Sequence, residues 1–203
     1  LGDLFEAWTG DDAAGPHEQS ILAALRRYTG TGRHCLFLRG NRDFLVGARF
    51  VAETGASLLP DEALVAVDGT RALLMHGDTL CTDDHAYRRY RRLVHHPAAQ
   101  ALYLGLPVGL RAGIAAYARH HSMAANAGKA AAIMDVNPLA VAGALRRHHV
   151  QLLIHGHTHR PAVHTLEVDG QMARRIVLGD WYTQGSVLQW TVAGPELRSL
   201  AFG

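Results

Sequence analysis

Four short blocks of this sequence place a glycine beside a side chain that binds metal ions well. They are Gly2-Asp3, Gly40-Asn41, His76-Gly77 and Gly156-His157-Thr158-His159, and each stands at the end of a short apolar run. Glycine permits a sharp turn and lets the backbone approach a ligand closely. Because ligands of open α/β sheets sit beyond the carboxyl ends of the strands, four such ends can converge on one site. The sequence therefore predicts a single site with ligands from four strand ends.

The donor atoms in these blocks indicate which metals the site would take. Imidazole, carboxylate and amide groups without a thiolate favour Mn²⁺, Fe²⁺ or Zn²⁺ over a structural zinc site. A carboxylate such as Asp3 has two oxygens and can bridge two cations about 3.5–4 Å apart, an arrangement that stabilises both the attacking and the leaving oxygen of a phosphoryl transfer. Cys35 and Cys81 lack C-x-x-C spacing, which argues against a zinc finger.

The composition is that of an ordinary globular domain. The chain has 203 residues, 48% of them hydrophobic and 19% charged, and a formal net charge of +2. This charge, with no basic stripe, speaks against nucleic acid as a partner. The two cysteines suggest no disulfide framework, and no secretory pattern is present, so we expect an intracellular chain. Two features are unusual: fourteen histidines, and a single lysine, Lys129.

The elements that would carry these blocks alternate between helix and strand. An amphipathic pattern predicts a helix over 17–28, and short apolar runs predict strands over 35–38 and 150–154. Two runs, 63–67 and 71–75, are joined by Asp68-Gly69 and predict a hairpin. The Ala-rich segment 84–149 reads as helical, with Asn137-Pro138 opening its last helix. Further strands are expected on both sides of Asp169-Gly170 and over 187–192.

The segment from Leu93 to Leu110 has no Asp, Glu, Lys or Arg but is too broken by proline and glycine to cross a membrane. Two interpretations remain from the segment itself. It is either an internal helical hairpin packed on the core, or a basic-flanked apolar surface that lies against a membrane or holds an acyl chain.

In their order, the blocks Gly2-Asp3, Gly40-Asn41-Arg42-Asp43, His76-Gly77-Asp78 and Gly156-His157-Thr158-His159 resemble those of the calcineurin-like dinuclear metallophosphoesterases. The stretches LGDLFEAWTGDD, HGDTLCTDD, AAIMDVN and LIHGHTHRPAVH resemble the subfamily that acts on UDP-2,3-diacylglucosamine in lipid A biosynthesis. The resemblance implies a four-layer αββα sandwich in one domain over 1–203, with a helical cap inserted at about 84–135.

The resemblance also implies a ligand set for two Mn²⁺ ions. Asp3 would bridge the two, Asn41, His76 and His157 would complete one site, and His159 would serve the other. The family's Asp-x-His motif has no counterpart in the residues given, so we expect a further strand that carries it before Leu1. Without that motif one metal site is incomplete.

By the same resemblance, substrate contacts fall on the blocks and on the cap. Arg42 stands where many relatives have histidine; a guanidinium cannot act as an acid near neutral pH, but it can hold a diphosphate at two points. Asp3, Asn41, Arg42 and His157 would be the catalytic residues. The head group of the substrate would be bound by Asn41, Arg42, Asp84, Ser122, Asn126, Lys129 and His157. Of these, Ser122, Asn126 and Lys129 are spaced so that they lie on one stripe of a helix. The mostly apolar segment 93–118 would hold the acyl chains.

The implied reaction is hydrolysis of UDP-2,3-diacylglucosamine to UMP and 2,3-diacylglucosamine 1-phosphate by a hydroxide held between the two metals. The enzyme would work as a peripheral protein on the cytoplasmic face of the inner membrane, with a lipid-linked nucleotide sugar as substrate and no nucleic acid or obligate protein partner. Two alternatives stay open: another calcineurin-like phosphodiesterase acting on a nucleotide, and an inactive, truncated scaffold.

The remaining candidates have simpler interpretations. His155 shares an extended face with His157 and is expected either to orient a ligand or to pack in the core. Asp43 and Asp78 are expected to hydrogen-bond the loops, and Asp11-Asp12 to form a turn or a helix cap. No role is assigned to Asp180 and Trp181.

Overall fold

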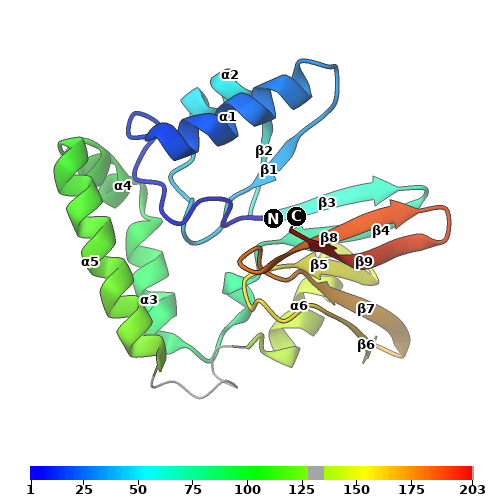
Figure 1. Ribbon diagram of the computed structural model, residues 1–203. Coiled ribbons are helices and arrows are strands. Elements are labelled where there is room, and N and C mark those ends of the chain that lie inside the picture. The colour runs from blue at the N-terminus through cyan, green and yellow to red at the C-terminus, as the bar shows by residue number, and fades with distance from the viewer. Residues whose placement is uncertain (128–134, 203) are drawn as a thin grey trace. The chain divides into compact units, whose positions relative to one another are not determined.

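The structure, a computed structural model, describes residues 1–127 and 135–202, apart from the side chains of 123–127. The chain divides into two compact units (Figure 1). The first unit contains Leu1, Pro60–Asp83 and Asp135–Gly203, and the second contains Gly2–Leu59 and Asp84–Met134.

The first unit is built on a five-stranded mixed sheet with the order β3-β4-β5-β7-β6. Its strands are β3 (Glu62–Val67), β4 (Thr70–Met75), β5 (Leu152–His155), β6 (Ala162–Val168) and β7 (Gln171–Val177). The strands β4, β5 and β7 run parallel, with Leu73 opposite Leu153 and Ile154 opposite Ile176. Their carboxyl ends therefore meet at one edge of the sheet, where three loops carry polar side chains.

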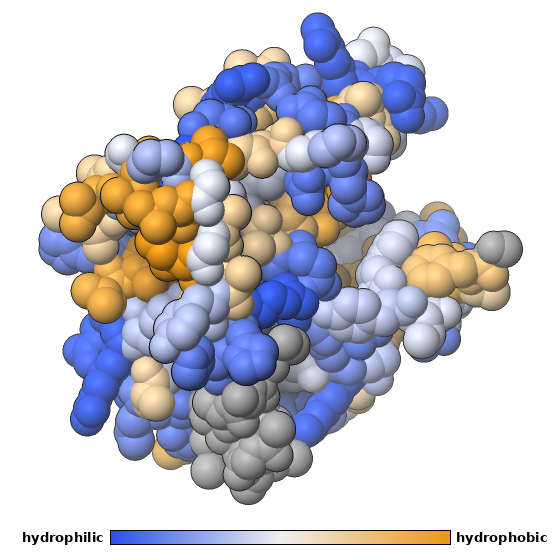
Figure 2. Space-filling view, turned by 60° about the vertical axis from the view of Figure 1, so that its left-hand side comes forward, coloured by the Kyte–Doolittle hydropathy of each residue, from blue (hydrophilic) through white to orange (hydrophobic). Residues whose placement is uncertain are grey.

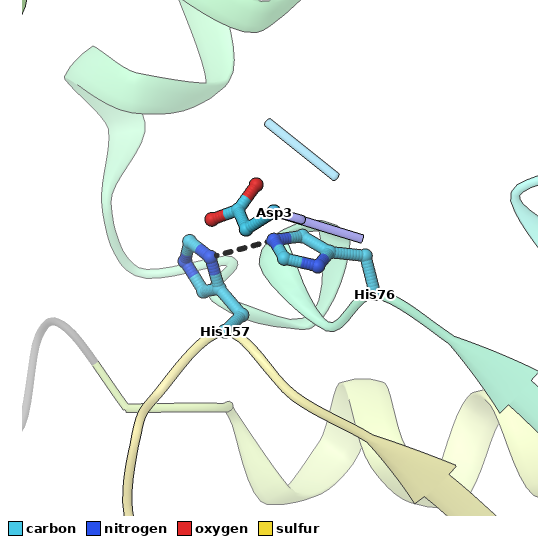
Figure 3. A group of neighbouring side chains, drawn as sticks. All are labelled: Asp3, His76 and His157. Carbon is cyan, nitrogen blue, oxygen red and sulfur yellow. Dashed lines mark hydrogen bonds between the residues drawn. The ribbon is translucent and has the colours of Figure 1, made fainter. Parts of the chain in front are cut away.

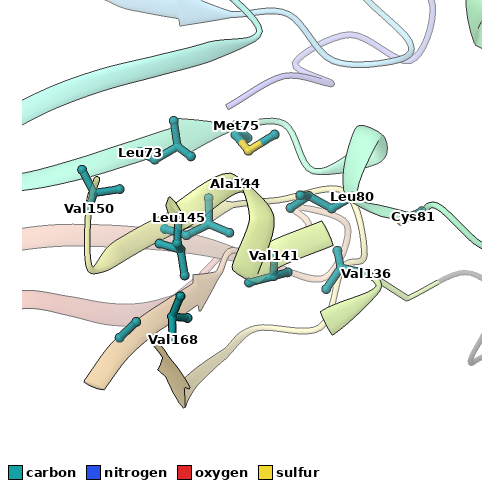
Figure 4. Packing of buried hydrophobic residues seen from close by; sticks show 12 residues of the cluster. Leu73, Met75, Leu80, Cys81, Val136, Val141, Ala144, Leu145, Val150 and Val168 are labelled. Carbon is teal, nitrogen blue, oxygen red and sulfur yellow. The ribbon is translucent and has the colours of Figure 1, made fainter. Parts of the chain in front are cut away.

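Alternating side chains give this sheet two buried faces. Leu73, Leu153 and Ala173 pack with Leu145 of helix α6 (Pro138–His148) on one face (Figure 4). On the other face, Ala72, Leu152, Ile154 and Ile176 pack with Leu188 and Trp190 of strand β8. The antiparallel hairpin of β8 (Gln184–Thr191) and β9 (Gly194–Ala201) thus lies over the face opposite α6. A short 3₁₀ helix, η1 (Asp78–Leu80), follows β4.

In its described residues, the second unit combines a small parallel sheet with five helices. Strands β1 (Leu36–Leu38) and β2 (Ser57–Leu59) pair in parallel, and helices α1 (Pro16–Thr29) and α2 (Ala48–Thr54) belong to the same part of the chain (Figure 1). Its core contains Phe5, Trp8, Leu22, Phe37, Val46, Phe50 and Ala56. The inserted helices are α3 (His85–Val94), α4 (Pro97–Leu104) and α5 (Val108–Ala127).

The buried residue Arg111 ties α5 to the N-terminal loop of the same unit. Its side chain is only 2% exposed, and Nη1 donates to the Thr9 carbonyl at 2.7 Å and to Asp12 Oδ1 at 2.8 Å. The second nitrogen, Nη2, pairs with Asp12 Oδ2. This pair fixes the start of α5 against residues more than ninety positions earlier in the chain.

The predicted α/β class is confirmed, and so are most of the expected elements. Asn137 caps α6 as expected, because its side chain accepts from the backbone N–H groups of Leu139 and Ala140. The sequence patterns did not predict α2, β2 or β9. The single-domain division with a cap at about 84–135 stays a prediction. Among the described residues, no helix combines the length and apolar character needed to cross a membrane.

Candidate metal-binding active site

The first unit places two predicted ligands side by side at the carboxyl edge of its sheet. His76 directly follows β4, and His157 lies in the loop after the neighbouring strand β5. His76 Nε2 and His157 Nδ1 are 3.1 Å apart, with the two rings edge to face (Figure 3). The predicted convergence is therefore observed for the ends of these two strands.

The backbone at Leu1 orients the His76 ring. His76 Nδ1 lies 2.9 Å from the Leu1 carbonyl, which can only accept, so Nδ1 carries the proton. The lone pair is then on Nε2, the atom that faces His157. A hydrogen bond of this kind to the far ring nitrogen is the usual way in which proteins fix the tautomer of a ligating histidine. His76 is also buried, so its ring is held firmly.

Asp3 is held near these histidines by the covalent chain, because it stands two residues after Leu1. Consecutive Cα atoms are about 3.8 Å apart, so Asp3 cannot lie far from the Leu1 carbonyl that His76 contacts. Asp3, His76 and His157 each offer one ligand atom to a metal ion (Figure 3). Two imidazoles and a carboxylate suit the divalent metals predicted from the sequence.

The second unit holds Asp3 on both of its carboxylate oxygens. Oδ1 accepts from the backbone N–H of Arg42 at 2.9 Å, and Oδ2 lies 3.3 Å from Arg42 Nε. Nη1 of the same guanidinium lies 3.3 Å from both carboxylate oxygens of Glu6. Arg42 thus contacts two carboxylates of the N-terminal loop.

Asp43 is fully buried and joins the loop of Asp3 to the loop of Asn41. Its Oδ2 accepts from Leu4 N at 2.8 Å, and its Oδ1 accepts from Gly40 N at 2.6 Å. Burial raises the pKa of Asp43, and these backbone N–H groups oppose that effect by stabilising the carboxylate. The expectation that Asp43 hydrogen-bonds the loops is confirmed.

His159 lies in the same loop as His157 but faces a different group. Its Nδ1 is 3.4 Å from Asp180 Oδ2, and its ring lies near that of Tyr182. Asp180 follows β7, whose carboxyl end shares the edge with β5. Sequence reasoning left Asp180 without a role, although Gly179-Asp180 repeats the pattern of a glycine and an acidic residue after an apolar run.

His155 ends β5 and is fully buried. Its Nδ1 lies 2.9 Å from the Gly156 carbonyl, and Arg175 Nη1 lies 3.5 Å from its Nε2. Burial lowers the pKa of His155 to about 4, so the ring is neutral near pH 7. Packing in the core, one of the two expectations for His155, is what the structure shows.

Three of the predicted substrate residues, Asp84, Ser122 and Asn126, belong to the inserted segment of the second unit. Asp84 is buried and caps α3, where its side chain accepts from Tyr87 N at 3.0 Å. Ser122 is exposed on α5, and Asn126 belongs to the last turns of that helix. Lys129 lies outside the described residues. Asp78, expected to hydrogen-bond its loop, is buried in η1.

Asp11 and Asp12 form a turn, as expected, and each also makes contacts that the sequence did not reveal. Asp11 accepts from the backbone N–H groups of Gly47, Arg49 and Phe50 at the start of α2. Asp12 pairs with Arg111, and Glu6 contacts Arg42. These partners are 36 or more positions apart in the chain, so no local pattern marks them.

The family whose description is calcineurin-like phosphoesterase matches residues 1–161 of this chain. The chain belongs to that family. Among curated relatives, it is 52% identical over 202 residues to a UDP-2,3-diacylglucosamine hydrolase of Klebsiella pneumoniae and 51% identical to one of Escherichia coli K12. Each match covers 100% of this chain and 84% of the relative.

A solved structure described as a novel archaeal phosphodiesterase is a more distant neighbour. It shares 15% identity and a TM-score of 0.40, over 96% of this chain and 80% of the other. A likeness this weak adds nothing to the assignment, which rests on the family match and the curated relatives.

Proposed function

We propose that this protein is a hydrolase that cleaves the diphosphate of UDP-2,3-diacylglucosamine, giving UMP and 2,3-diacylglucosamine 1-phosphate for lipid A biosynthesis. The observation that carries the proposal is the match to curated UDP-2,3-diacylglucosamine hydrolases, which extends over the whole chain at about half identity. The match includes the helices α3 to α5, which we assign to the substrate cap.

We assign the metal-binding role to Asp3, Asn41, His76, His157 and His159. The donor set fits, because it offers oxygen and nitrogen atoms without a thiolate. The hydrogen bond of His76 Nδ1 to the Leu1 carbonyl also directs the lone pair of Nε2 toward His157. We propose two Mn²⁺ ions as the resident metals. When bound, such ions lower the pKa of water to about 7 and supply a nucleophile at neutral pH.

Arg42 would bind the diphosphate of the substrate. A guanidinium holds two phosphate oxygens at once and stabilises the charge that develops on them, but it cannot donate a proton to the leaving group near neutral pH. A sugar phosphate or UMP leaves as a stabilised anion, so a proton donor at this position is less needed. The contacts of Arg42 with Asp3 and Glu6 fix where the guanidinium stands.

The cap helices would bind the lipid part of the substrate. Large apolar side chains are exposed on α4 and α5, and Figure 2 shows apolar surface gathered over this part of the molecule. These residues are Leu102, Leu104, Val108, Leu110, Ile114 and Tyr117. Large exposed apolar patches on folded proteins mark binding sites for partners, membranes or ligands. We assign Ser122, Asn126 and Lys129 to the binding of the head group.

We also propose that the protein works as a peripheral protein on the cytoplasmic face of the inner membrane. A substrate with two acyl chains resides in a membrane, so an enzyme that takes it must reach the membrane surface. The apolar residues of α4 and α5 support such contact, and α3 adds four arginines, Arg88, Arg89, Arg91 and Arg92, which attract anionic lipid head groups.

Substrate discrimination tests the proposal. With the full-length protein, Lys129→Ala should raise KM for UDP-2,3-diacylglucosamine about tenfold, because one charged contact to the head group is lost, and leave hydrolysis of bis(p-nitrophenyl) phosphate unchanged. Equal losses on both substrates would remove Lys129 from the head-group site. Turnover of the small diester alone would favour another phosphodiesterase of the same family.

A further inference from the structure

Four charged residues of the second unit form a continuous line of contacts from a proposed metal ligand to the cap helix α5. They are Asp3, Arg42, Glu6 and Arg119. We propose that Glu6 is a positioning residue, which holds the Arg42 guanidinium in its working orientation and ties it to α5. The inference rests on the proposed function, because it assigns Glu6 a task through Arg42.

The guanidinium of Arg42 is held at two of its nitrogens by two different carboxylates. Nε lies 3.3 Å from Asp3 Oδ2, and Nη1 lies 3.3 Å from both oxygens of Glu6. The backbone N–H of Arg42 adds a third fixed point through Asp3 Oδ1. A long arginine side chain has many rotamers, and contacts at both edges of its planar fork select one of them.

Glu6 is also the residue through which α5 reaches this arrangement. Arg119 Nη1 donates to the Glu6 backbone carbonyl at 2.6 Å, and Arg119 Nη2 pairs with the Glu6 carboxylate. One carboxylate therefore lies between two guanidinium groups, one from the loop after β1 and one from the cap. Without Glu6, the two guanidinium groups would lose the carboxylate that they share, and their repulsion would shift Arg42 from its position.

Because Glu6 is exposed, its effect on the reaction rate can be measured separately from its effect on stability. Its side chain is 56% exposed, and exposed ion pairs contribute little to stability. A catalytic group displaced by about 1 Å, in contrast, can lose about a hundredfold in rate. The loss of Glu6 should therefore be visible in kcat and not in the melting temperature.

A double-mutant cycle tests this assignment on the full-length protein, with release of UMP from UDP-2,3-diacylglucosamine in detergent micelles as the readout. Glu6→Ala should lower kcat at least about tenfold with little change in KM, and Glu6→Gln, which keeps the shape but not the charge, should lower it less. In an Arg42→Ala background, Glu6→Ala should change kcat less than about twofold, because the group that it positions is gone.

Glu53→Ala is the matched control, because Glu53 also pairs with an arginine of this unit, Arg49 at 2.6 Å, without contacting Arg42. Its kcat should equal that of the wild type. The inference is wrong if Glu6→Ala keeps wild-type kcat, or if its effect multiplies fully with that of Arg42→Ala. It is also wrong if Glu6→Gln and Glu6→Ala lose activity only in proportion to a fall in melting temperature.

Failure of the proposed function gives a different result. If the wild type releases no UMP, the substrate assignment fails, and the same cycle is read on bis(p-nitrophenyl) phosphate. Coupling between Glu6 and Arg42 on that diester supports the positioning role independently of the lipid substrate, and additivity there overturns it.

Discussion

Asp3, His157 and His159 share a backbone conformation that residues other than glycine rarely adopt. Their φ angles are +57°, +67° and +56°. The other described non-glycine residues with positive φ stand in turns or at a helix end: Asp68 and Asp169 before hairpin glycines, and His149 at the end of α6. Such conformations cost about 1–3 kcal/mol each and concentrate at functional sites. The strained residues outside ordinary turns are thus three of the proposed ligands.

The glycine-and-ligand pattern predicted that His76 and His157 would meet, because parallel strand ends share an edge. It could not predict the partner of each ring. The Leu1 carbonyl that orients His76 is 75 positions away, and Asp180 reaches His159 only because β7 lies beside β5. Pairing of strands that are distant in sequence decides such contacts, and a single sequence does not encode it locally.

Replacement of His157 by alanine removes an imidazole from the proposed metal centre. We expect kcat on UDP-2,3-diacylglucosamine to fall at least about a hundredfold and the bound metal to fall by about one equivalent per chain, measured by mass spectrometry of the metal content. His17→Ala, at the exposed start of α1, is the control and should change neither. A His157→Ala protein that keeps more than about a tenth of the activity would exclude this ligand.

Helix α5 depends on one buried ion pair. Arg111 is 2% exposed, whereas its partner Asp12 is 54% exposed. Arg111 directly follows the apolar run 93–110 in the sequence. A basic residue beside such a run is ordinarily solvated. Burial of a flanking arginine follows from the turn at Asp12, which lies 99 positions earlier. Helix α2 was not predicted for the same reason, because the backbone N–H groups at its start donate to Asp11, which is distant in the sequence.

Asp12→Ala should destabilise the protein more than the loss of one partner of an exposed ion pair does. The substitution leaves a buried guanidinium without its carboxylate, which costs about 2–3 kcal/mol. Asp169→Ala is the matched control, because Asp169 pairs with Arg146 while both side chains are at least half exposed. We expect a loss of about 0–1 kcal/mol there. Urea denaturation measures both, and equal losses would contradict the buried-pair account.

The Asp12–Arg111 pair also predicts a pH dependence of stability. The hydrogen bond from Arg111 lowers the pKa of Asp12 below its value of about 3.9 in an unfolded chain. Because the folded pKa is depressed, the contribution of Asp12 is fully present above about pH 4 and is lost as the pH falls through the folded pKa. The stability difference between wild type and Asp12→Asn should therefore shrink below about pH 4. A difference that stays constant from pH 7 to pH 2 would exclude this linkage.

The sheet of the first unit supports the His76–His157 pair. It is buried on both faces, by α6 on one side and by the β8–β9 hairpin on the other. Apolar runs and the turns between them predicted most of its strands, and Asn137-Pro138 predicted the start of α6. It could not predict the order β3-β4-β5-β7-β6, because the order depends on which faces find partners after the chain has folded.

Leu153→Ala tests how far this core supports the site. Leu153 is fully buried in the central strand β5, so the substitution removes apolar contacts and leaves a cavity, at a cost of about 2–5 kcal/mol. Leu139→Ala, on the exposed side of α6, should cost less than about 1 kcal/mol. Chemical denaturation gives both values. A cost below 1 kcal/mol for Leu153→Ala would contradict the packing described for β5.

The products formed from UDP-2,3-diacylglucosamine show which bond of the substrate the enzyme breaks. The full-length protein is incubated with this substrate in mixed micelles and Mn²⁺, and the phosphorus species are followed by ³¹P NMR. We expect loss of the diphosphate signals and equimolar appearance of UMP and 2,3-diacylglucosamine 1-phosphate, both abolished by EDTA. Release of UDP with a sugar that carries no phosphate, or an intact diphosphate after prolonged incubation with Mn²⁺, would contradict the proposed function.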